Sequence, residues 1–464
     1  MRYVSTRGRA PALTFEDVLL AGLARDGGLY VPEEWPTLSK ADFKAMRGLA
    51  YAEVAARVMQ PFVGRAMKAD DLVQMTAETY AVFDHAAVAP LSQIGRNQWV
   101  MELFHGPTLA FKDFALQLLG RLFDHVLTKR GQRVCIVGAT SGDTGSAAIE
   151  ACKGRKSIDI VILHPRGRVS EVQRRQMTTV LESNVHNIAI EGSFDDCQDM
   201  VKAMFNDTAF RDSMNLSAVN SINWARIMAQ IAYYIAAGVA LGAPERSFTF
   251  AVPTGNFGNV FAGYAARKMG LPIDKLVVGS NANDILTRFL ETGAMTMGRV
   301  VPTLSPSMDI QVSSNFERLL FLALARNGAA VEKLMEGFRS SGEFRLPAKP
   351  MQAIRALFEG RRLDDAATRA AIKGLHKLTG QILDPHSAIG VAAGLECHDY
   401  KRSTLVALAT AHPAKFPDAI EAAIGIRPQL PERLAGLMTK KERCAAAPNK
   451  LSAVQDLIRA KVKP

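Results

Sequence analysis

The sequence is poor in cysteine. It holds five in 464 residues, at positions 135, 152, 197, 397 and 444, and no two of them form a CxxC pair. They also lack the clustered spacing with histidine that is typical of zinc sites. Scattered free thiols are typical of a reducing compartment rather than of secreted, disulfide-stapled proteins. We therefore expect a cytoplasmic protein with neither disulfides nor a bound metal.

Long hydrophobic runs are also missing. The longest, such as residues 231–243, are shorter than the roughly 20 residues that a membrane-spanning helix needs, and they fit a buried helix better. The first eight residues, Met-Arg-Tyr-Val-Ser-Thr-Arg-Gly, contain no apolar stretch of the kind found in secretory signals. The sequence therefore predicts no membrane partner and no secretion.

The positive charge is concentrated in the C-terminal tail. The net charge is +11, and residues 427–464 hold nine Lys or Arg against three Asp or Glu. No zinc-finger spacing, RNP-like aromatic motif or basic zipper accompanies this charge. The apolar residues of the tail recur at helical spacing, which predicts short amphipathic helices packed on the body of the protein. We expect no nucleic-acid partner, and the remaining positive charge favours an anionic small substrate.

Three segments repeat the order of a β-rich run, a polar or glycine-rich loop, and a helical pattern. The loops span residues 138–145, 253–259 and 410–417. The expected strands are 133–137, 158–163, 248–252, 276–278 and 405–409, and helices are expected over 146–152, up to 268, and over 418–423. Such alternation predicts an α/β fold with parallel sheets, with ligands bound at the carboxyl ends of the strands.

Composition suggests four segments. Residues 1–90 are more helical and lack a comparable loop, so they form a separate N-terminal unit. We assign residues 91–230 to one α/β domain, 231–430 to a second, and 431–464 to the basic helical tail. Residues 340–375, rich in charge and alanine, predict surface helices.

Two of the loops have the chemistry of anion sites. Residues 255–259 open a helix, so their backbone N–H groups can converge on a phosphate, although the loop is neither a GxGxxG fingerprint nor a P-loop. Residues 141–145, Ser-Gly-Asp-Thr-Gly, add two hydroxyls, which suits a carboxylate or phosphate oxygen. Asp143 is also compatible with a helix cap, and an ordinary glycine-rich turn remains open for residues 255–259.

Lys112 lies in the apolar stretch 104–115, directly after a Gly-Pro turn and at the start of a helical pattern. Apolar surroundings favour the neutral amine, which is a nucleophile and a base. The alternative is a lysine whose stem covers apolar surface while its amine stays in water. The two anion-binding loops favour the first interpretation, because a reactive lysine, a carboxylate loop and a phosphate loop together describe a pyridoxal-phosphate (PLP) enzyme.

A specific family resemblance rests on segments that occur in order along nearly the whole chain. They are Tyr3-Val-Ser-Thr-Arg-Gly8, Asp26-Gly-Gly-Leu-Tyr-Val-Pro32, His105-Gly-Pro-Thr-Leu-Ala-Phe-Lys-Asp-Phe114, Ser141-Gly-Asp-Thr-Gly145, Ser170-Glu-Val-Gln-Arg-Arg-Gln-Met177, Gly192-Ser-Phe-Asp-Asp-Cys-Gln198, Ser221-Ile-Asn-Trp-Ala-Arg226, Pro253-Thr-Gly-Asn-Phe-Gly-Asn259, Ser313-Ser-Asn-Phe-Glu-Arg318, Asp384-Pro-His386 and Ala409-Thr-Ala-His-Pro-Ala-Lys-Phe416. In these the chain resembles the threonine synthase family, in its longer bacterial and fungal form. That family shares fold type II of the PLP enzymes with the tryptophan synthase β chain.

The resemblance implies a role for each matching residue. Lys112 carries PLP as a Schiff base, and Thr410 faces the pyridine nitrogen. The cofactor phosphate is held by Gly255, Asn256, Phe257 and Asn259. The substrate carboxylate is received by Ser141, Gly142, Asp143, Thr144 and Gly145. Candidates for the substrate phosphate are Arg174, Arg175, Arg226, Arg318 and Lys415, and several of these are equally compatible with structural ion pairs.

The implied reaction converts O-phospho-L-homoserine and water to L-threonine and phosphate, by a PLP-dependent carbon–oxygen lyase that is a monomer or a homodimer. Two alternatives stay open. Threonine-synthase-like relatives act as phospho-lyases that yield 2-oxobutyrate and ammonia, and a non-catalytic PLP-binding protein is also conceivable. The resemblance further implies two parallel-sheet domains and an additional N-terminal unit, which we expect to contribute to a lid over the site.

Overall fold

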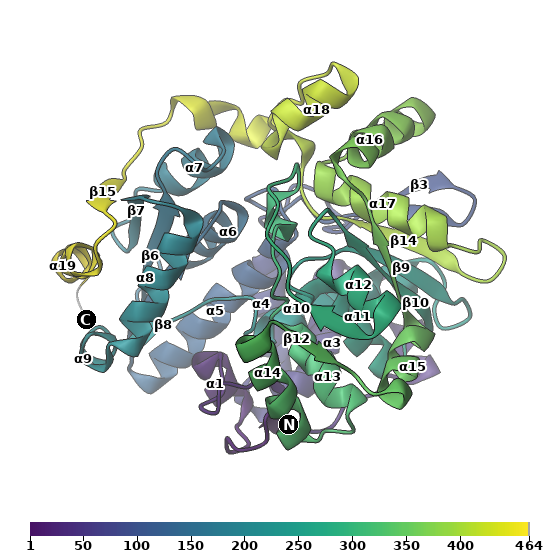
Figure 1. The fold of residues 1–464 in the computed structure, drawn as a ribbon, viewed down its shortest axis with the longest axis horizontal. Helices are drawn as coiled ribbons and strands as arrows, with labels where there is room; N and C mark the ends of the chain where they lie inside the picture. Colours follow the sequence, from purple (N-terminus) through teal and green to yellow (C-terminus); the bar gives the residue numbers. More distant parts are fainter. Residues whose placement is uncertain (463–464) are drawn as a thin grey trace. The chain divides into compact units, whose positions relative to one another are not determined.

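The computed structural model describes residues 1–462, which form two compact units. Unit 1 comprises residues 1–106 and 221–428, and unit 2 comprises residues 107–220 together with the segment that begins at Gln429. Figure 1 labels their elements along the chain. The division at residues 90, 230 and 430 that composition suggests stays a prediction.

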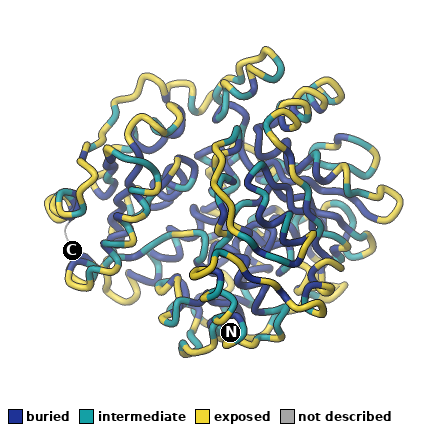
Figure 2. The backbone as a smooth tube through the Cα atoms, in the orientation of Figure 1, coloured by how far each residue is buried: buried dark blue, intermediate teal, exposed yellow. Residues whose placement is uncertain are grey.

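Unit 1 is built on a six-stranded sheet. In spatial order its strands are β13 (Phe358–Arg362), β10 (Ile273–Ser280), β9 (Phe248–Pro253), β14 (Thr404–Ala409), β4 (Gln98–Glu102) and β3 (Leu91–Gly95). All neighbours are parallel except the edge pair β3 and β4, which is antiparallel. Every residue of β9 and β14 is buried, as parallel strands covered on both faces require (Figure 2).

Helices cover both faces of this sheet. Ala251 of β9 packs in a core cluster with residues of α17 (Pro385–Cys397). The next strand residue back, Phe250, points to the opposite face and contacts the ring of Tyr234 from α10 (Trp224–Ala240). The alternation follows from the two-residue period of a strand. The remaining helices of this half are α11 (Gly258–Lys268), α12 (Ile285–Thr292), α13 (Phe316–Ala323), α14 (Gly328–Ser341), α16 (Asp365–Thr379) and α18 (Pro417–Ile424).

The prediction of surface helices over residues 340–375 is wrong in part. The helices α15 (Ala348–Leu357) and α16 are present, but β13 lies between them and pairs in parallel with β10. Its sequence, Phe-Glu-Gly-Arg-Arg, carries charges because β13 is an edge strand, so periodicity alone does not reveal it. A short antiparallel pair, β11 (Ala294–Thr296) with β12 (Glu343–Arg345), completes the region.

The N-terminal segment belongs to unit 1. It contains the antiparallel pair β1 (Tyr3–Ser5) and β2 (Tyr30–Pro32), and the helices α1 (Phe15–Ala21), α2 (Lys40–Ala45), α3 (Tyr51–Val63) and α4 (Ala69–Tyr80). The fully buried Trp224 at the start of α10 contacts the rings of Tyr3 and Phe62. The Tyr3 hydroxyl donates a hydrogen bond to the carbonyl of Phe62 at 2.7 Å. Aromatic packing thus fastens this segment to α10.

Unit 2 has a five-stranded, wholly parallel sheet. In spatial order its strands are β15 (Ala445–Pro448), β7 (Val185–Glu191), β6 (Ile158–Pro165), β5 (Val134–Ala139) and β8 (Leu216–Ser217). Its helices are α5 (Lys112–Arg130), α6 (Asp143–Cys152), α7 (Glu171–Thr178), α8 (Phe194–Asn206), α9 (Thr208–Ser213) and α19 (Leu451–Lys461). The five strands expected from sequence over 133–163, 248–278 and 405–409 are all present.

The C-terminal tail is not purely helical. It forms the 3₁₀ helix η4 (Glu432–Thr439) and the helix α19, as expected, but β15 adds a strand beside β7. Ala447 of β15 is buried in the same core cluster as Val454 and Ile458 of α19. Four residues with three alanines give no alternating pattern, which is why the sequence does not predict this strand.

Within residues 1–462, no helix combines the length and apolar character needed to cross a membrane. The same residues contain no group of three or more His, Cys, Asp or Glu placed to hold a metal ion. All five cysteines are free thiols.

Candidate functional site

Lys112 is the first residue of α5, and its side chain is 11% exposed. Its Nζ lies 3.4 Å from Oδ2 of Asp143, in the loop that opens α6. The chain reaches Lys112 through Leu109, whose φ of +63° is unusual for a residue with a side chain. The amine is therefore held inside unit 2 beside a carboxylate, and does not extend into solvent.

The turn before Lys112 is fixed by its neighbour Asp113, which the sequence analysis did not single out. The fully buried carboxylate accepts hydrogen bonds from the backbone N–H and the hydroxyl of Thr108, both at 2.8 Å. It also accepts one from Nε2 of Gln117 at 3.2 Å. Asp113 thereby closes the turn over residues 108–113 and sets the direction in which α5 presents the lysine.

Residues 141–145 lead from β5 into α6, and some of their backbone N–H groups are already engaged in hydrogen bonds. The hydroxyl oxygen of Thr140 accepts hydrogen bonds from the N–H groups of Gly142 and Gly145, each at 2.9 Å. Gly142 has a φ of +144°, and a Cβ there would collide with the side chain of Gln173. For an incoming carboxylate, the loop offers the hydroxyls of Ser141 and Thr144 and its remaining N–H groups.

Asp143 is held from two sides. Its Oδ1 accepts a hydrogen bond from Nε2 of Gln173 at 2.7 Å, while Oδ2 faces the Lys112 amine. The side chain is 5% exposed. An ionised carboxylate is only an acceptor, so this side chain cannot donate to a substrate carboxylate. The other oxygen of Asp143, Oδ2, therefore faces the Lys112 amine. Gln173 holds Asp143 in this position, and the sequence analysis did not identify it.

Arg174 and Arg175 are committed to carboxylates of unit 2. Arg174 forms a close ion pair with Glu442, and Nη1 of Arg175 lies 3.7 Å from the same carboxylate. Nε of Arg175 also lies 3.2 Å from Glu171. Partial burial opposes ionisation of Glu442, but hydrogen bonds from Arg174 and Thr178 outweigh it and lower the pKa of Glu442. Both guanidinium groups therefore anchor the C-terminal tail to α7.

In unit 1, residues 255–259 comprise the end of the loop after β9 and the first two residues of α11. Phe257 has a φ of +63° and immediately precedes the helix. The loop is braced by the Ser313 hydroxyl, which donates to the carbonyl of Gly255 at 2.7 Å, and by the N–H of Asn315, which donates to the carbonyl of Asn256 at 3.1 Å. A Cβ on Gly255 would lie 3.1 Å from the carbonyl oxygen of Ser307, so the backbone there is closely packed.

Unsatisfied donors gather at the start of α11. The hydroxyls of Tyr233 and Tyr234 donate to Oδ1 of Asn259 at 2.6 and 2.9 Å, but no group among residues 1–462 accepts from the buried Nδ2 of Asn259. The buried Nδ2 of Asn315 is likewise unsatisfied within those residues, and it would lie 3.2 Å from a Cβ on Gly258. Buried donors without acceptors at a helix N-terminus fit an anionic oxygen, such as one of a phosphate group.

Arg226 is a buried cation without a counter-ion. It is 5% exposed, and among the described residues it makes no ion pair and its Nη1 has no hydrogen-bond acceptor. Burial lowers the pKa of its guanidinium to about 10, an effect partly offset by Tyr233. Since the group stays charged at neutral pH, it has the character of an anion receptor.

Arg318 is different, because neutral groups satisfy its donors. It donates to the carbonyl of Tyr30 at 2.9 Å and makes closer contacts with Oδ1 of Asn315 and the carbonyl of Ile222. Complete burial lowers its pKa to about 9, and the nearby Glu317 partly offsets this. Its donors tie β2 and the start of α10 to α13. Lys415, a further candidate, is fully buried.

Thr410 lies at the carboxyl end of β14 and is buried. Its N–H donates to the hydroxyl of Ser387 at 2.8 Å, and Ser387 in turn contacts the carboxylate of Asp384. The same carboxylate binds Nδ1 of His386 at 2.8 Å. This network fixes the backbone of Thr410 at the strand end, where ligands of parallel sheets bind.

Three family models match the chain in order: "Threonine synthase N terminus" over residues 2–80, "Pyridoxal-phosphate dependent enzyme" over 85–333, and "Threonine synthase, C-terminal" over 387–458. The chain is 58% identical to the threonine synthase of Pseudomonas aeruginosa, over 99% of this chain and 98% of that one. The chain belongs to the threonine synthase family of PLP-dependent enzymes. The family, the fold type and the cofactor expected from the motifs are thereby confirmed.

Solved structures of the family agree closely with this fold. PLP-bound threonine synthase from Brucella melitensis superposes with a TM-score of 0.98 at 55% identity, covering all of both chains. Threonine synthase from yeast gives a TM-score of 0.94 at 38% identity, covering 99% of this chain and 98% of that one. The similarity includes the N-terminal segment and the tail, so the family assignment rests on the full length.

Proposed function

We propose that this protein converts O-phospho-L-homoserine and water to L-threonine and inorganic phosphate. The observation that carries the proposal is Lys112, a buried amine at a helix start beside Asp143, in a chain related to threonine synthases over its full length. By its match to the motif of the family, we assign this lysine to the covalent bond with PLP. The bound cofactor supplies an electron sink for the carbanions that elimination requires.

Residues 255–259 are our candidates for the cofactor phosphate. The N–H groups at the start of α11 and the unsatisfied Nδ2 of Asn259 offer donors to phosphate oxygens. Gly255, Asn256 and Phe257 bring the backbone close, and Asn315 is added to the set on the same grounds. Thr410 is assigned to the pyridine nitrogen, where a neutral hydroxyl does not favour its protonation.

Lys112 also moves the protons of the reaction. With PLP and substrate bound, its amine would remove the proton at Cα and then serve at Cβ. Asp143, 3.4 Å away, holds the amine and balances the charge it gains on protonation. Gln173 fixes Asp143 for this purpose. These roles place a proton carrier and its counter-ion on two rigid helix starts.

The substrate's two anionic ends need separate receptors. We assign its carboxylate to the loop of Ser141, Gly142, Asp143, Thr144 and Gly145, with the hydroxyls and N–H groups as donors. We assign its phosphate first to Arg226, because that cation alone among the arginine candidates lacks a partner within the described residues. Arg174 and Arg318 remain weaker candidates, since Glu442 and neutral carbonyls already engage them.

The proposal extends to the setting of the enzyme. We infer a cytoplasmic monomer or homodimer that acts on this small molecule and has no nucleic-acid partner. The supporting observations are the free thiols and the absence of a nucleic-acid motif in the sequence. The basic tail is engaged in folding unit 2, where Arg443 donates to the carbonyls of Glu182 and Val185.

Product analysis in water labelled with ¹⁸O tests the proposed reaction. The PLP-loaded protein is incubated with O-phospho-L-homoserine, and amino acid, keto acid and phosphate are analysed by mass spectrometry. We expect threonine with one ¹⁸O in its hydroxyl and phosphate without ¹⁸O, because the Cγ–O bond breaks and water adds at Cβ. Labelled 2-oxobutyrate with ammonia identifies a phospho-lyase, labelled phosphate with homoserine identifies simple hydrolysis, and unchanged substrate identifies a binding protein. Each of these three results refutes the proposal.

A further inference from the structure

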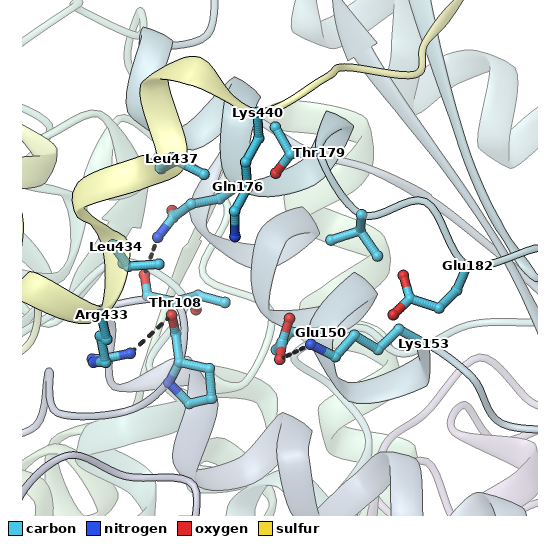
Figure 3. Close-up of a pocket in the computed structure, with 12 residues that line it drawn as sticks. Thr108, Glu150, Lys153, Gln176, Thr179, Glu182, Arg433, Leu434, Leu437 and Lys440 are labelled. Carbon is cyan, nitrogen blue, oxygen red and sulfur yellow. Dashed lines mark hydrogen bonds and ion pairs between the residues drawn. The ribbon is translucent and has the colours of Figure 1, made fainter.

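A cavity of about 310 Å³ is lined only by residues of unit 2, and Lys112 is not among them (Figure 3). Its walls come from the second half of α6, the end of α7 and the residues that follow, the 3₁₀ helix η4 of the tail, and the turn at Pro107 and Thr108. None of the residues assigned to the reaction lines it. Its volume is at the lower end of the range for small-molecule sites.

The charges around this cavity have both signs. Glu150 forms an ion pair with Lys153, and Arg433 donates to the carbonyl of Pro107 at 3.2 Å, but Lys440 and Glu182 make no ion pair with any described residue. Figure 3 shows the Lys440 ammonium directed into the cavity, between Gln176 and Glu150. Leu434 and Leu437 give the same cavity an apolar wall. Three cations, two carboxylates and an apolar wall in one lining suit a small zwitterion with an apolar part.

Gln176 supplies an independent indication of a ligand. It is 92% buried, that is 8% exposed, and its Nε2 donates to the carbonyl of Thr108 at 3.1 Å. No group in residues 1–462 donates to its buried Oε1, although Gln176 lines the cavity. A buried acceptor without a donor costs free energy, so an N–H donor supplied from the cavity would be stabilising.

We propose that this cavity is a second small-molecule site, which binds a free α-amino acid with an apolar side chain. The ammonium group of the ligand donates to Oε1 of Gln176, and its carboxylate meets the ammonium of Lys440. Its side chain packs on Leu434 and Leu437. The ammonium of the ligand thereby supplies the donor that Oε1 of Gln176 lacks, and its carboxylate supplies a counter-ion to Lys440.

The site is connected to the catalytic lysine by three hydrogen-bonded residues. Gln176 holds the carbonyl of Thr108, Thr108 donates twice to Asp113, and Asp113 adjoins Lys112. A ligand that fixes the Gln176 amide also fixes the turn that presents Lys112. The site is therefore suited to an effector rather than to a second substrate. The inference does not depend on the proposed reaction.

Calorimetric titration of the PLP-loaded enzyme with L-leucine, L-valine, L-methionine and L-phenylalanine, one at a time, tests this site. We expect at least one to bind, and Lys440→Met to weaken that binding by about tenfold, since a charged hydrogen bond is lost. Lys441→Met is the matched control, because Lys441 is exposed and does not line the cavity. The amine and the acid that correspond to the binding amino acid, lacking carboxylate or ammonium, should each bind more weakly.

Three results overturn the inference. The first is no binding of any of the four amino acids with a Kd below about 10 mM. The second is equal binding by the wild type and Lys440→Met. The third is binding that always changes the absorption of the cofactor and is displaced by O-phospho-L-homoserine, because that behaviour locates the ligand in the active site.

Discussion

Lys112 is the central residue of the proposed site. Its amine lies beside Asp143, and the residue itself begins a helix that Asp113 orients. We predict that Lys112→Ala folds but loses activity by far more than the roughly 10²–10⁴-fold that a lost acid–base group costs, since covalent attachment of the cofactor is lost as well. Borohydride reduction and peptide mapping of the wild type should find PLP on Lys112. Lys129→Ala, on the same helix, is the control, and a reduced adduct on another lysine contradicts the assignment.

Arg226 should lower the thermal stability of the protein while contributing to its activity. A buried cation without a counter-ion is destabilising, so Arg226→Met should raise the thermal midpoint. If Arg226 binds the substrate phosphate, the same change should cost on the order of 2–5 kcal/mol in kcat/KM while PLP content is retained. Arg174→Met serves as comparison, because Glu442 already engages that charge.

Three outcomes would count against the assignment of Arg226. An unchanged kcat/KM would exclude it from the substrate site. Loss of PLP in proportion to activity would place it at the cofactor phosphate instead. A larger effect from Arg174→Met would favour α7 as the receptor of the substrate phosphate.

Thr410 offers a test of the cofactor's electronic environment. Thr410→Asp would place a carboxylate at the end of β14, and a negative charge beside the pyridine nitrogen favours its protonated form. We expect altered absorption on addition of substrate and slower turnover. Thr410→Ser, which keeps the hydroxyl, should behave nearly as the wild type. If Thr410→Asp changes neither spectrum nor rate, Thr410 does not face the ring.

Among the elements, β15 shows how a short strand can matter. Ala447 is 2% exposed in the core of unit 2, while its neighbour Ala446 is exposed. Ala447→Asp should lower the free energy of unfolding by about 3 kcal/mol, because it buries a charge without a partner. Ala446→Asp should stay within about 0.5 kcal/mol. Urea denaturation followed by far-UV circular dichroism measures the free energy of unfolding of both variants. Equal effects of the two substitutions would mean that β15 is not packed as described.

The starts of α5, α6 and α11, which hold the proposed site residues, share a feature. Each follows a residue or loop with an unusual backbone: Leu109 before α5, Gly142 before α6 and Phe257 before α11. Side chains from neighbouring segments then fix these bends, such as Asp113, Thr140 and Ser313. Unusual backbone thus precedes each of these three helix starts, where ligands are expected, and local hydrogen bonds offset its cost.

In the full chain, the tail completes unit 2 rather than extending from it. Val454, Ile458 and Val462 share a core cluster with strands β5, β6 and β7. A chain ending at residue 428 should therefore expose that core, and limited proteolysis should cut within residues 107–220 while sparing unit 1. A fragment pattern identical to that of the full-length protein would show that the tail is dispensable.

Much of this protein can be predicted from local pattern alone. The apolar runs that become β5, β6, β9, β10 and β14, and the glycine loops between them, carry their structure in a few adjacent residues. Lys112 and the family motifs are equally local. These features can be predicted from the sequence because strand periodicity, turn chemistry and helix starts depend on neighbouring residues in the chain.

Other features depend on contacts between distant segments. The edge strands β13 and β15 exist because β10 and β7 offer them hydrogen bonds, although their own residues are charged or alanine-rich. The sequence presents Arg174, Arg226 and Arg318 as equals. Tertiary structure distinguishes them, because Glu442 lies 268 residues from Arg174 and Tyr30 lies 288 from Arg318, while no described carboxylate reaches Arg226. Whether a charge is paired is decided by folding, and that pairing separates a structural cation from one available to a ligand.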